Sequence, residues 1–122
     1  MKQIRHALPD VISAHIAAHN SGDGDAFMAT FAQNALLNDA QREFLGQQAI
    51  RAWAEKEIFG DNVSMHVEQA YEHHANIVLH ARVDGDFDKS QLPDPVILSY
   101  YFSIDAGKIT QLIILLNKSI GP

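Results

Sequence analysis

Apolar residues in the first part of the chain recur at the three- and four-residue spacing of helices. Pro9 suits a first helical turn, where its missing N–H would have had no partner. Asn20 to Gly22 supply the capping chemistry of a helix end. We therefore predict a helix between these signals, with one apolar face that includes two histidines. The residues of this face are Val11, Ile12, His15, Ile16 and His19.

A second helix is predicted directly after this turn. Asp23 or Asp25 can cap it, because acidic side chains suit the positive end of a helix dipole. A short strand-like run over residues 35–37 follows and ends at Asp39, and a polar loop is expected over residues 40–45. The apolar face of this helix comprises Phe27, Thr30 and Phe31.

A third helix is expected over residues 47–59, with Gly60 at its end. Its buried face comprises Ile50, Trp53, Ala54 and Ile58. After residue 62 the apolar spacing changes to two, which is typical of half-buried strands. The strands are expected over residues 63–68, 77–83, 96–104 and 108–116, with a turn at 73–76, a Pro-rich loop at 85–95 and a turn at 105–107. Helices followed by antiparallel strands indicate the α+β class.

The last predicted strand is apolar on both faces. Leu112, Ile114 and Leu116 lie on one face, and Ile109, Ile113 and Leu115 lie on the other. A strand covered on both sides needs a second layer besides the helices. We therefore expect a homodimer in which a second copy covers the outer face of the sheet.

Composition narrows the functional classes. The 122 residues suit a single domain over residues 1–122. The net charge of −6 argues against nucleic acid, whose binding depends on Lys and Arg, and no basic run or apolar span suggests a membrane partner. The absence of cysteine fits a reducing compartment, and the first ten residues lack the apolar core of a signal peptide, so we expect a cytoplasmic protein.

The order of several short motifs resembles the nuclear transport factor 2-like superfamily, in particular its SnoaL-like branch. The resemblance covers nearly the whole chain. The motifs are Asn20-Ser21-Gly22-Asp23, Phe31-Ala32, Asp39, Gly46-Gln47-Gln48-Ala49-Ile50-Arg51 and, over residues 85–114, GDFDKSQLPDPVILSYYFSIDAGKITQLII.

This resemblance implies a fold and a range of functions. The implied fold is a cone-shaped α+β roll, in which a curved antiparallel or mixed sheet wraps around three N-terminal helices and leaves an apolar cavity. Similar proteins include ketosteroid isomerase, scytalone dehydratase, limonene-epoxide hydrolase and polyketide cyclases, besides members that only bind partners. Since one fold serves many functions, the function has to be argued from the site.

The resemblance places Asp39 where ketosteroid isomerase keeps its catalytic base. A carboxylate over an apolar cavity can take a proton from carbon next to a carbonyl. The alternative is an Asp that caps backbone N–H groups at a turn. His15 falls where the isomerase has an oxyanion-stabilising tyrosine, and a neutral imidazole could still donate to an enolate. The alternative for His15 is a buried histidine bonded to a backbone carbonyl.

A second oxyanion donor is expected on the strand over residues 96–104. Leu98, Tyr100 and Phe102 form its more apolar face, so we place Tyr100 in the cavity and keep Ser99 as the alternative, since a one-residue slip exchanges the faces. The acidic residue that the isomerase has here is absent. Aromatic and thioether side chains are expected to form the ligand-contacting wall and, with overlapping roles, part of the core: Phe27, Phe31, Trp53, Phe59, Met65 and Phe102.

Metal and cofactor chemistry are not expected. His15 and His19 share a helix face and could join Asp39 in a two-histidine, one-carboxylate site, but the glutamate of a zincin motif is missing. No phosphate-binding loop or dinucleotide fingerprint is present.

Three functions remain open. The first is a lyase or isomerase that acts on a carbonyl or polyketide-like substrate, with Asp39 as general base and His15 and Tyr100 as donors. The second is a non-catalytic module that binds an apolar ligand or assembles as a dimer. The third is epoxide-type hydrolysis, which would need an arginine paired with a second acid in the cavity; Arg82 and Asp84 are the nearest candidates, but they lie on a polar strand face.

Overall fold

A computed structural model describes residues 2–117 of the chain. Helix α1 (Asp10–Ser21) begins after Pro9 and ends at Gly22, whose φ of 72° places it in the left-handed region. The N–H of Asp23 donates to the Ala18 carbonyl at 3.1 Å, which completes a Schellman-type end. Asp23 then caps α2 (Gly24–Ala29), because its carboxylate accepts from the Ala26 N–H at 3.0 Å. The two predicted helices and the turn between them are confirmed, but α2 ends at Ala29, so Phe31, which was predicted on its face, lies in a strand instead.

The segment after α2 forms a hairpin. Strand β2 (Phe31–Asp39) is longer than the three-residue run that the sequence indicated, and it pairs with β3 (Arg42–Leu45). Ala40 and Gln41 form the two-residue turn with φ values of 53° and 69°. The expectation of a loop over residues 40–45 is therefore wrong. The signal was weak because neither turn residue is the Gly or Asn that favours positive φ in such hairpins.

The third helix covers the predicted range in two parts. Helix α3 (Gln47–Ala54) continues as the π-helical turn η1 (Glu55–Phe59), and its four predicted core residues are all buried. At Gly60 a Cβ atom would lie 2.5 Å from the Lys56 carbonyl oxygen. Glycine is therefore needed where the chain turns away from η1.

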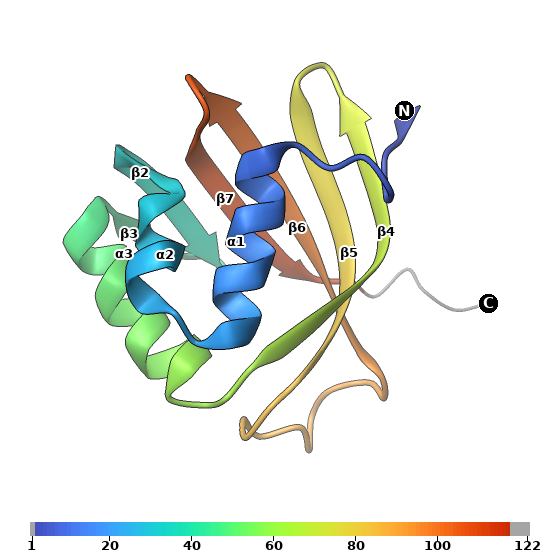
Figure 1. The fold of residues 1–122 in the computed structure, drawn as a ribbon. Coiled ribbons are helices and arrows are strands. Elements are labelled where there is room, and N and C mark those ends of the chain that lie inside the picture. Colours follow the sequence, from blue (N-terminus) through green and yellow to red (C-terminus); the bar gives the residue numbers. More distant parts are fainter. Residues whose placement is uncertain (1, 118–122) are drawn as a thin grey trace.

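The remaining strands are β1 (Lys2–Gln3), β4 (Ser64–His73), β5 (Asn76–Asp84), β6 (Val96–Asp105) and β7 (Lys108–Leu116). They join β2 and β3 in a seven-stranded sheet of order β1-β4-β5-β6-β7-β2-β3. Only the β2–β7 pair is parallel within the described residues, so the sheet is mixed. Figure 1 shows that the sheet is strongly curved and that α1 lies across its inner face, with α2 and α3 beside it. This is the predicted α+β architecture.

The register of β6 follows the prediction. Tyr100 and Phe102 are buried on the inner face, and Tyr101 is 39% exposed on the outer one. On β7 the prediction that Ile109 shares a face with Ile113 and Leu115 is wrong. The register shifts between Ser103 and Ile104, so Ile109 turns inward and is fully buried.

No helix among the described residues is long and apolar enough to cross a membrane.

Candidate functional site

A cavity of about 270 Å³ lies between the C-terminal part of the α3–η1 helix and the inner face of the sheet. Its walls are mostly aliphatic, and four polar side chains interrupt them: Asp39, Glu57, Asp61 and Tyr100. The volume is close to the lower end of the range for small-molecule sites, roughly 300 Å³. It suits a ligand of one or two rings. The apolar lining residues are Ala40, Trp53, Ile58, Val63, Val83, Phe87, Leu92, Val96, Leu98, Ile114 and Leu116.

Asp39 lies at the end of β2, and its side chain is 22% exposed. Its Oδ2 atom accepts from the indole Nε1 of Trp53 at 3.0 Å and from Nη2 of Arg42 at 2.7 Å. Its Oδ1 atom accepts no hydrogen bond from the described residues. One carboxylate oxygen is therefore held in place, while the other keeps its lone pairs for a ligand.

Arg42 connects Asp39 to a second acid. Its guanidinium forms a two-pronged contact with Glu57, with Nη1–Oε2 and Nη2–Oε1 distances of 2.9 and 2.8 Å. The hydrogen bond to Glu57 raises the pKa of Arg42, and the same bond lowers the pKa of Glu57. Arg42 is half exposed and is not among the residues that line the cavity. The acid–arginine–acid group therefore lies at the rim of the cavity.

Tyr100 enters the same cavity from β6. Its side chain is only 3% exposed, and its hydroxyl makes no hydrogen bond to the described residues. Burial raises the pKa of Tyr100, and the charge of Asp39 raises it further. The phenol therefore keeps its proton and remains a hydrogen-bond donor at physiological pH. Ser99, the alternative, does not line the cavity.

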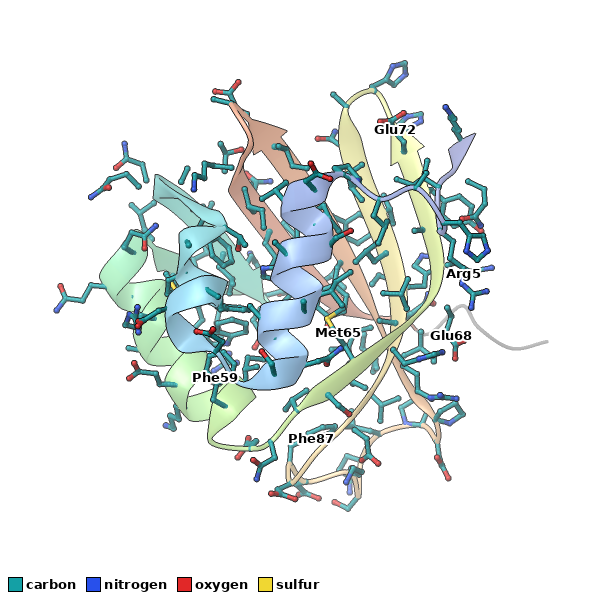
Figure 2. The ribbon with its side chains drawn as sticks, in the orientation of Figure 1. Arg5, Phe59, Met65, Glu68, Glu72 and Phe87 are labelled. Atoms are coloured by element: carbon teal, nitrogen blue, oxygen red, sulfur yellow. The ribbon has the colours of Figure 1, made fainter. Side chains whose placement is uncertain are left out.

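The loop between β5 and β6 covers the cavity with two apolar side chains, Phe87 and Leu92. Figure 2 shows Phe87 on this loop, at the end of the molecule away from the chain's N-terminus. The loop is tied to the turn after η1, because the Asp86 N–H donates to the Asp61 carbonyl at 2.7 Å and the Asn62 amide donates to the Asp86 carboxylate at 2.7 Å.

His15 does not join this site, contrary to the sequence-based expectation. It is 1% exposed, and its ring packs against three phenylalanines: Phe27, Phe31 and Phe102. The Thr30 hydroxyl donates its proton to the Phe27 carbonyl at 2.7 Å, so Nδ1 of His15 must donate to the Thr30 oxygen, 3.1 Å away. Burial and, to a smaller extent, the neighbouring His19 together lower the pKa of His15 to about 3. His15 is a neutral core residue, as the alternative reading had it, although its partner is a hydroxyl.

His19 lies one turn further along α1 and lines a separate shallow hollow beside Phe59 and Val63. Burial lowers the pKa of His19 to about 4, against the effect of a hydrogen bond to the main chain of Val63. Its Nε2 atom is buried without a hydrogen-bond partner in the described part of the chain. The described residues contain no group of three or more potential ligands that could hold a metal ion.

Of the six side chains expected to contact a ligand, Trp53 alone lines the cavity. Phe27, Phe31 and Phe102 surround His15, and Phe59 packs edge-on against Phe27 at 5.5 Å. Met65 is buried beside the C-terminal end of α1, where Asn20 forms two hydrogen bonds with the Met65 backbone (Figure 2). The expected wall is therefore mainly core, because α1 and α2 fill that end of the sheet's concave face.

Arg42, Glu57 and Asp61 were not predicted from the sequence as part of the site. Arg42 follows Asp39 by three residues, and this spacing would have indicated an ion pair if the hairpin had been recognised. Arg82 and Asp84, the pair considered for hydrolysis, are exposed and bind other partners, Glu68 at 3.7 Å and Lys89 at 3.0 Å.

Known proteins resemble this chain in fold, although not in sequence-based searches. No protein-family model and no curated protein matches the chain in sequence. Among solved structures, a proposed polyketide cyclase from Sinorhizobium meliloti superposes with a TM-score of 0.80 and 28% identity, over 88% of this chain and 95% of that one.

A protein with a ketosteroid isomerase-like fold from Catenulispora acidiphila, solved with trimethylamine, gives a TM-score of 0.76 and 20% identity over 93% of this chain and 89% of that one. A computationally designed binder of 17-OHP superposes with a TM-score of 0.71 and 13% identity, over 90% of this chain and 90% of that one. The chain therefore has the nuclear transport factor 2-like fold, as its motifs indicated, in the form shared by ketosteroid isomerase-like and polyketide cyclase-like proteins.

Proposed function

We propose that the cavity binds a small, largely apolar molecule with a carbonyl group and catalyses a lyase- or isomerase-type reaction through its enol. The observation that carries this proposal is the presence of Asp39 and the unpaired Tyr100 hydroxyl in one apolar cavity. The polyketide cyclase-like and ketosteroid isomerase-like neighbours support a small-molecule role for this fold.

In the proposed reaction Asp39 is the general base. Its Oδ1 takes a proton from the carbon next to the carbonyl, while Trp53 and Arg42 keep Oδ2 in place. The Tyr100 hydroxyl donates to the carbonyl oxygen as negative charge develops there. A well-placed donor of this kind contributes about 2.7–4 kcal/mol to stabilising the transition state. His15 has no part in this reaction, because it does not line the cavity.

Proton exchange tests the proposal without knowledge of the natural substrate. β-Tetralone, a two-ring ketone with acidic α-protons, is incubated with the protein in D₂O, and deuterium incorporation is followed by NMR. We expect exchange above the buffer rate, lost in Asp39→Asn and reduced about 10²- to 10³-fold in Tyr100→Phe. Asp88→Asn, a change on the loop outside the cavity, is the matched control.

Binding without turnover is the second candidate. The observation that favours it is that two donors already hold Asp39, as they would hold a structural carboxylate. The designed binder of 17-OHP has the same fold. If β-tetralone binds with equal affinity to the natural protein and to Asp39→Asn, and neither accelerates exchange, the protein is a binding module.

Epoxide hydrolysis remains the least supported alternative. The Asp39–Arg42–Glu57 group provides an arginine between two acids, but Arg42 lies at the rim rather than in the wall of the cavity. Water activated there would be open to solvent. An epoxide of similar size that stays unhydrolysed while β-tetralone exchanges would exclude this alternative.

We also propose that a second copy covers the outer face of the sheet. Tyr101 and Leu115 are each 39% exposed there, and a hollow of about 480 Å³ extends from Tyr71 to Ile113. Apolar side chains exposed together on a sheet face are typical of interaction surfaces. Sedimentation that gives only the 13.5 kDa species at micromolar concentration would contradict this proposal.

A further inference from the structure

The charged side chains that line the cavity all have the same sign. They are Asp39, Glu57 and Asp61, and the described lining residues include no Lys, Arg or His. Charges in a cavity with apolar walls are less screened than charges in bulk water. The sign of the charges that line the cavity therefore favours a ligand of the opposite charge.

Nearby basic residues compensate this charge only in part. Arg42 offers one positive charge to two acids, Asp39 and Glu57, and the charge of Lys56 acts on Glu57 from the neighbouring position. The Asp61 carboxylate forms no ion pair and no hydrogen bond with the described residues. Lys89 is close to Phe87, but it forms an ion pair with Asp84 at 3.0 Å. A net negative charge therefore remains around the cavity.

Two further features point to a ligand rather than to a solvated acidic surface. Tyr100 is buried in the cavity wall as a residue, and its hydroxyl has no hydrogen-bond partner among the described residues. Three aromatic side chains, Trp53, Phe87 and Tyr100, line the same space. The faces of aromatic rings attract cations, most strongly where water is excluded.

We propose that the natural ligand is a cation, namely an apolar ring system that carries a protonated amine. This inference rests on the proposed function, because it assigns a substrate class to the same cavity. The carbonyl lies toward Asp39 and Tyr100, and the ammonium lies toward Asp61 at the end of η1. Ligands with a carboxylate, a phosphate or another anionic group are disfavoured by the same charges.

Three probes of matched size test the charge preference. Naphthylmethylamine is protonated at pH 7, naphthalenemethanol is neutral and naphthoate is anionic, and each is titrated in competition with β-tetralone at low salt. We expect the amine to bind at least about fivefold more tightly than the alcohol, and the naphthoate to bind more weakly than the alcohol. Raising the salt concentration to about 0.5 M should reduce the advantage of the amine, because salt screens exposed charges.

Asp61→Asn identifies the residue responsible. It should weaken amine binding by about three- to tenfold and change alcohol binding less than twofold. Asp88→Asn removes one negative charge from the loop outside the cavity, and it should change neither amine binding nor alcohol binding.

The outcomes separate this inference from the proposed function. If the alcohol competes with β-tetralone but the amine binds no better, the charge preference is wrong and the small-molecule site stands. An amine advantage that Asp61→Asn and Asp88→Asn reduce equally would also overturn the inference, because it would reflect net charge alone. If no probe and no ketone binds, both proposals fail.

Discussion

The interior around His15 and the cavity around Asp39 lie on the same face of one sheet, and they differ in what surrounds their polar groups. His15 has a hydrogen-bond partner and three phenylalanines packed around it. Asp39 and Tyr100 face a space of about 270 Å³. Oδ1 of Asp39 and the hydroxyl oxygen of Tyr100 form no hydrogen bond with the described residues. Buried polar groups that have their partners stabilise a fold, whereas unpaired ones beside a cavity are available to a ligand.

The largest expected difference is in catalysis. Asp39→Asn should slow β-tetralone exchange by about 10²- to 10⁴-fold, since it removes the general base. His15→Gln keeps a donor for Thr30 and should change the rate per folded molecule less than threefold. The exchange assay measures both, with circular dichroism as the control for folding. A comparable loss in the two variants would erase the functional distinction between the regions.

The second difference is in packing. Leu112 is 1% exposed opposite Phe102, whereas Leu98 is half-buried in the cavity wall. Leu112→Ala should lower the free energy of unfolding by about 2–5 kcal/mol, because it leaves a void in a close-packed region. Leu98→Ala should cost less than about 2 kcal/mol, since it enlarges a space that already exists. Urea denaturation gives both values, and equal losses would contradict the contrast.

The third difference is in the effect of pH on stability. The folded state keeps His15 and His19 neutral, with pKa values lowered from 6.5 to about 3 and about 4. Between the unfolded pKa of 6.5 and the lowered folded pKa values, each histidine is protonated in the unfolded state but not in the folded state. The free energy of unfolding therefore falls as the pH decreases from about 6.5 toward 4. Each histidine contributes up to about 1.4 kcal/mol per pH unit.

His19→Gln isolates one of these contributions. It should flatten the dependence of the unfolding free energy on pH by about 1.4 kcal/mol per unit between pH 6 and 4.5. The lowered pKa of Glu57 affects the natural protein and the variant alike, so its contribution cancels from the difference between their slopes. An unchanged slope would mean that His19 is solvated in the folded protein.

The smallest expected effect concerns the anchoring of Asp39. Trp53→Phe keeps an aromatic ring at this position and removes the indole N–H that donates to Oδ2 of Asp39. The loss of one such bond corresponds to about 0.5–1.5 kcal/mol, so the exchange rate should fall by roughly two- to tenfold. Because Trp53 also lines the cavity, the affinity for β-tetralone is measured separately and the rates are compared at saturating ketone; the rate at saturation should fall more than the affinity. Equal changes in rate and affinity would argue against a positioning role.

Local patterns predicted much of the fold. The stripe on α1, the capping by Asp23, the range of α3–η1 and the inner face of β6 follow directly from residue spacing. The misses have tertiary causes. Strand β1 has two residues and exists only through its pairing with β4, and the inward turn of Ile109 depends on a register shift between two strands.

The candidate site was predictable only in part. Asp39, Trp53 and Tyr100 line the cavity. The family resemblance pointed to Asp39, and the apolar faces of a helix and a strand pointed to Trp53 and Tyr100. His15 shares its apolar helix face with core residues, and spacing alone could not show whether phenylalanines or a cavity would meet it. Arg42, Glu57 and Asp61 come together only when the β2–β3 hairpin folds against the end of α3–η1.

Methyl NMR during a titration with β-tetralone tests the central claim most directly, because it reports on both regions in one experiment. We expect the signals of Val83, Leu98 and Ile114 in the cavity wall to shift with saturation. Those of Ile12 and Leu112, in the interior that contains His15, should stay in place. Saturable shifts at Ile12 and Leu112 without shifts at the cavity wall would contradict the assignment of the ligand site.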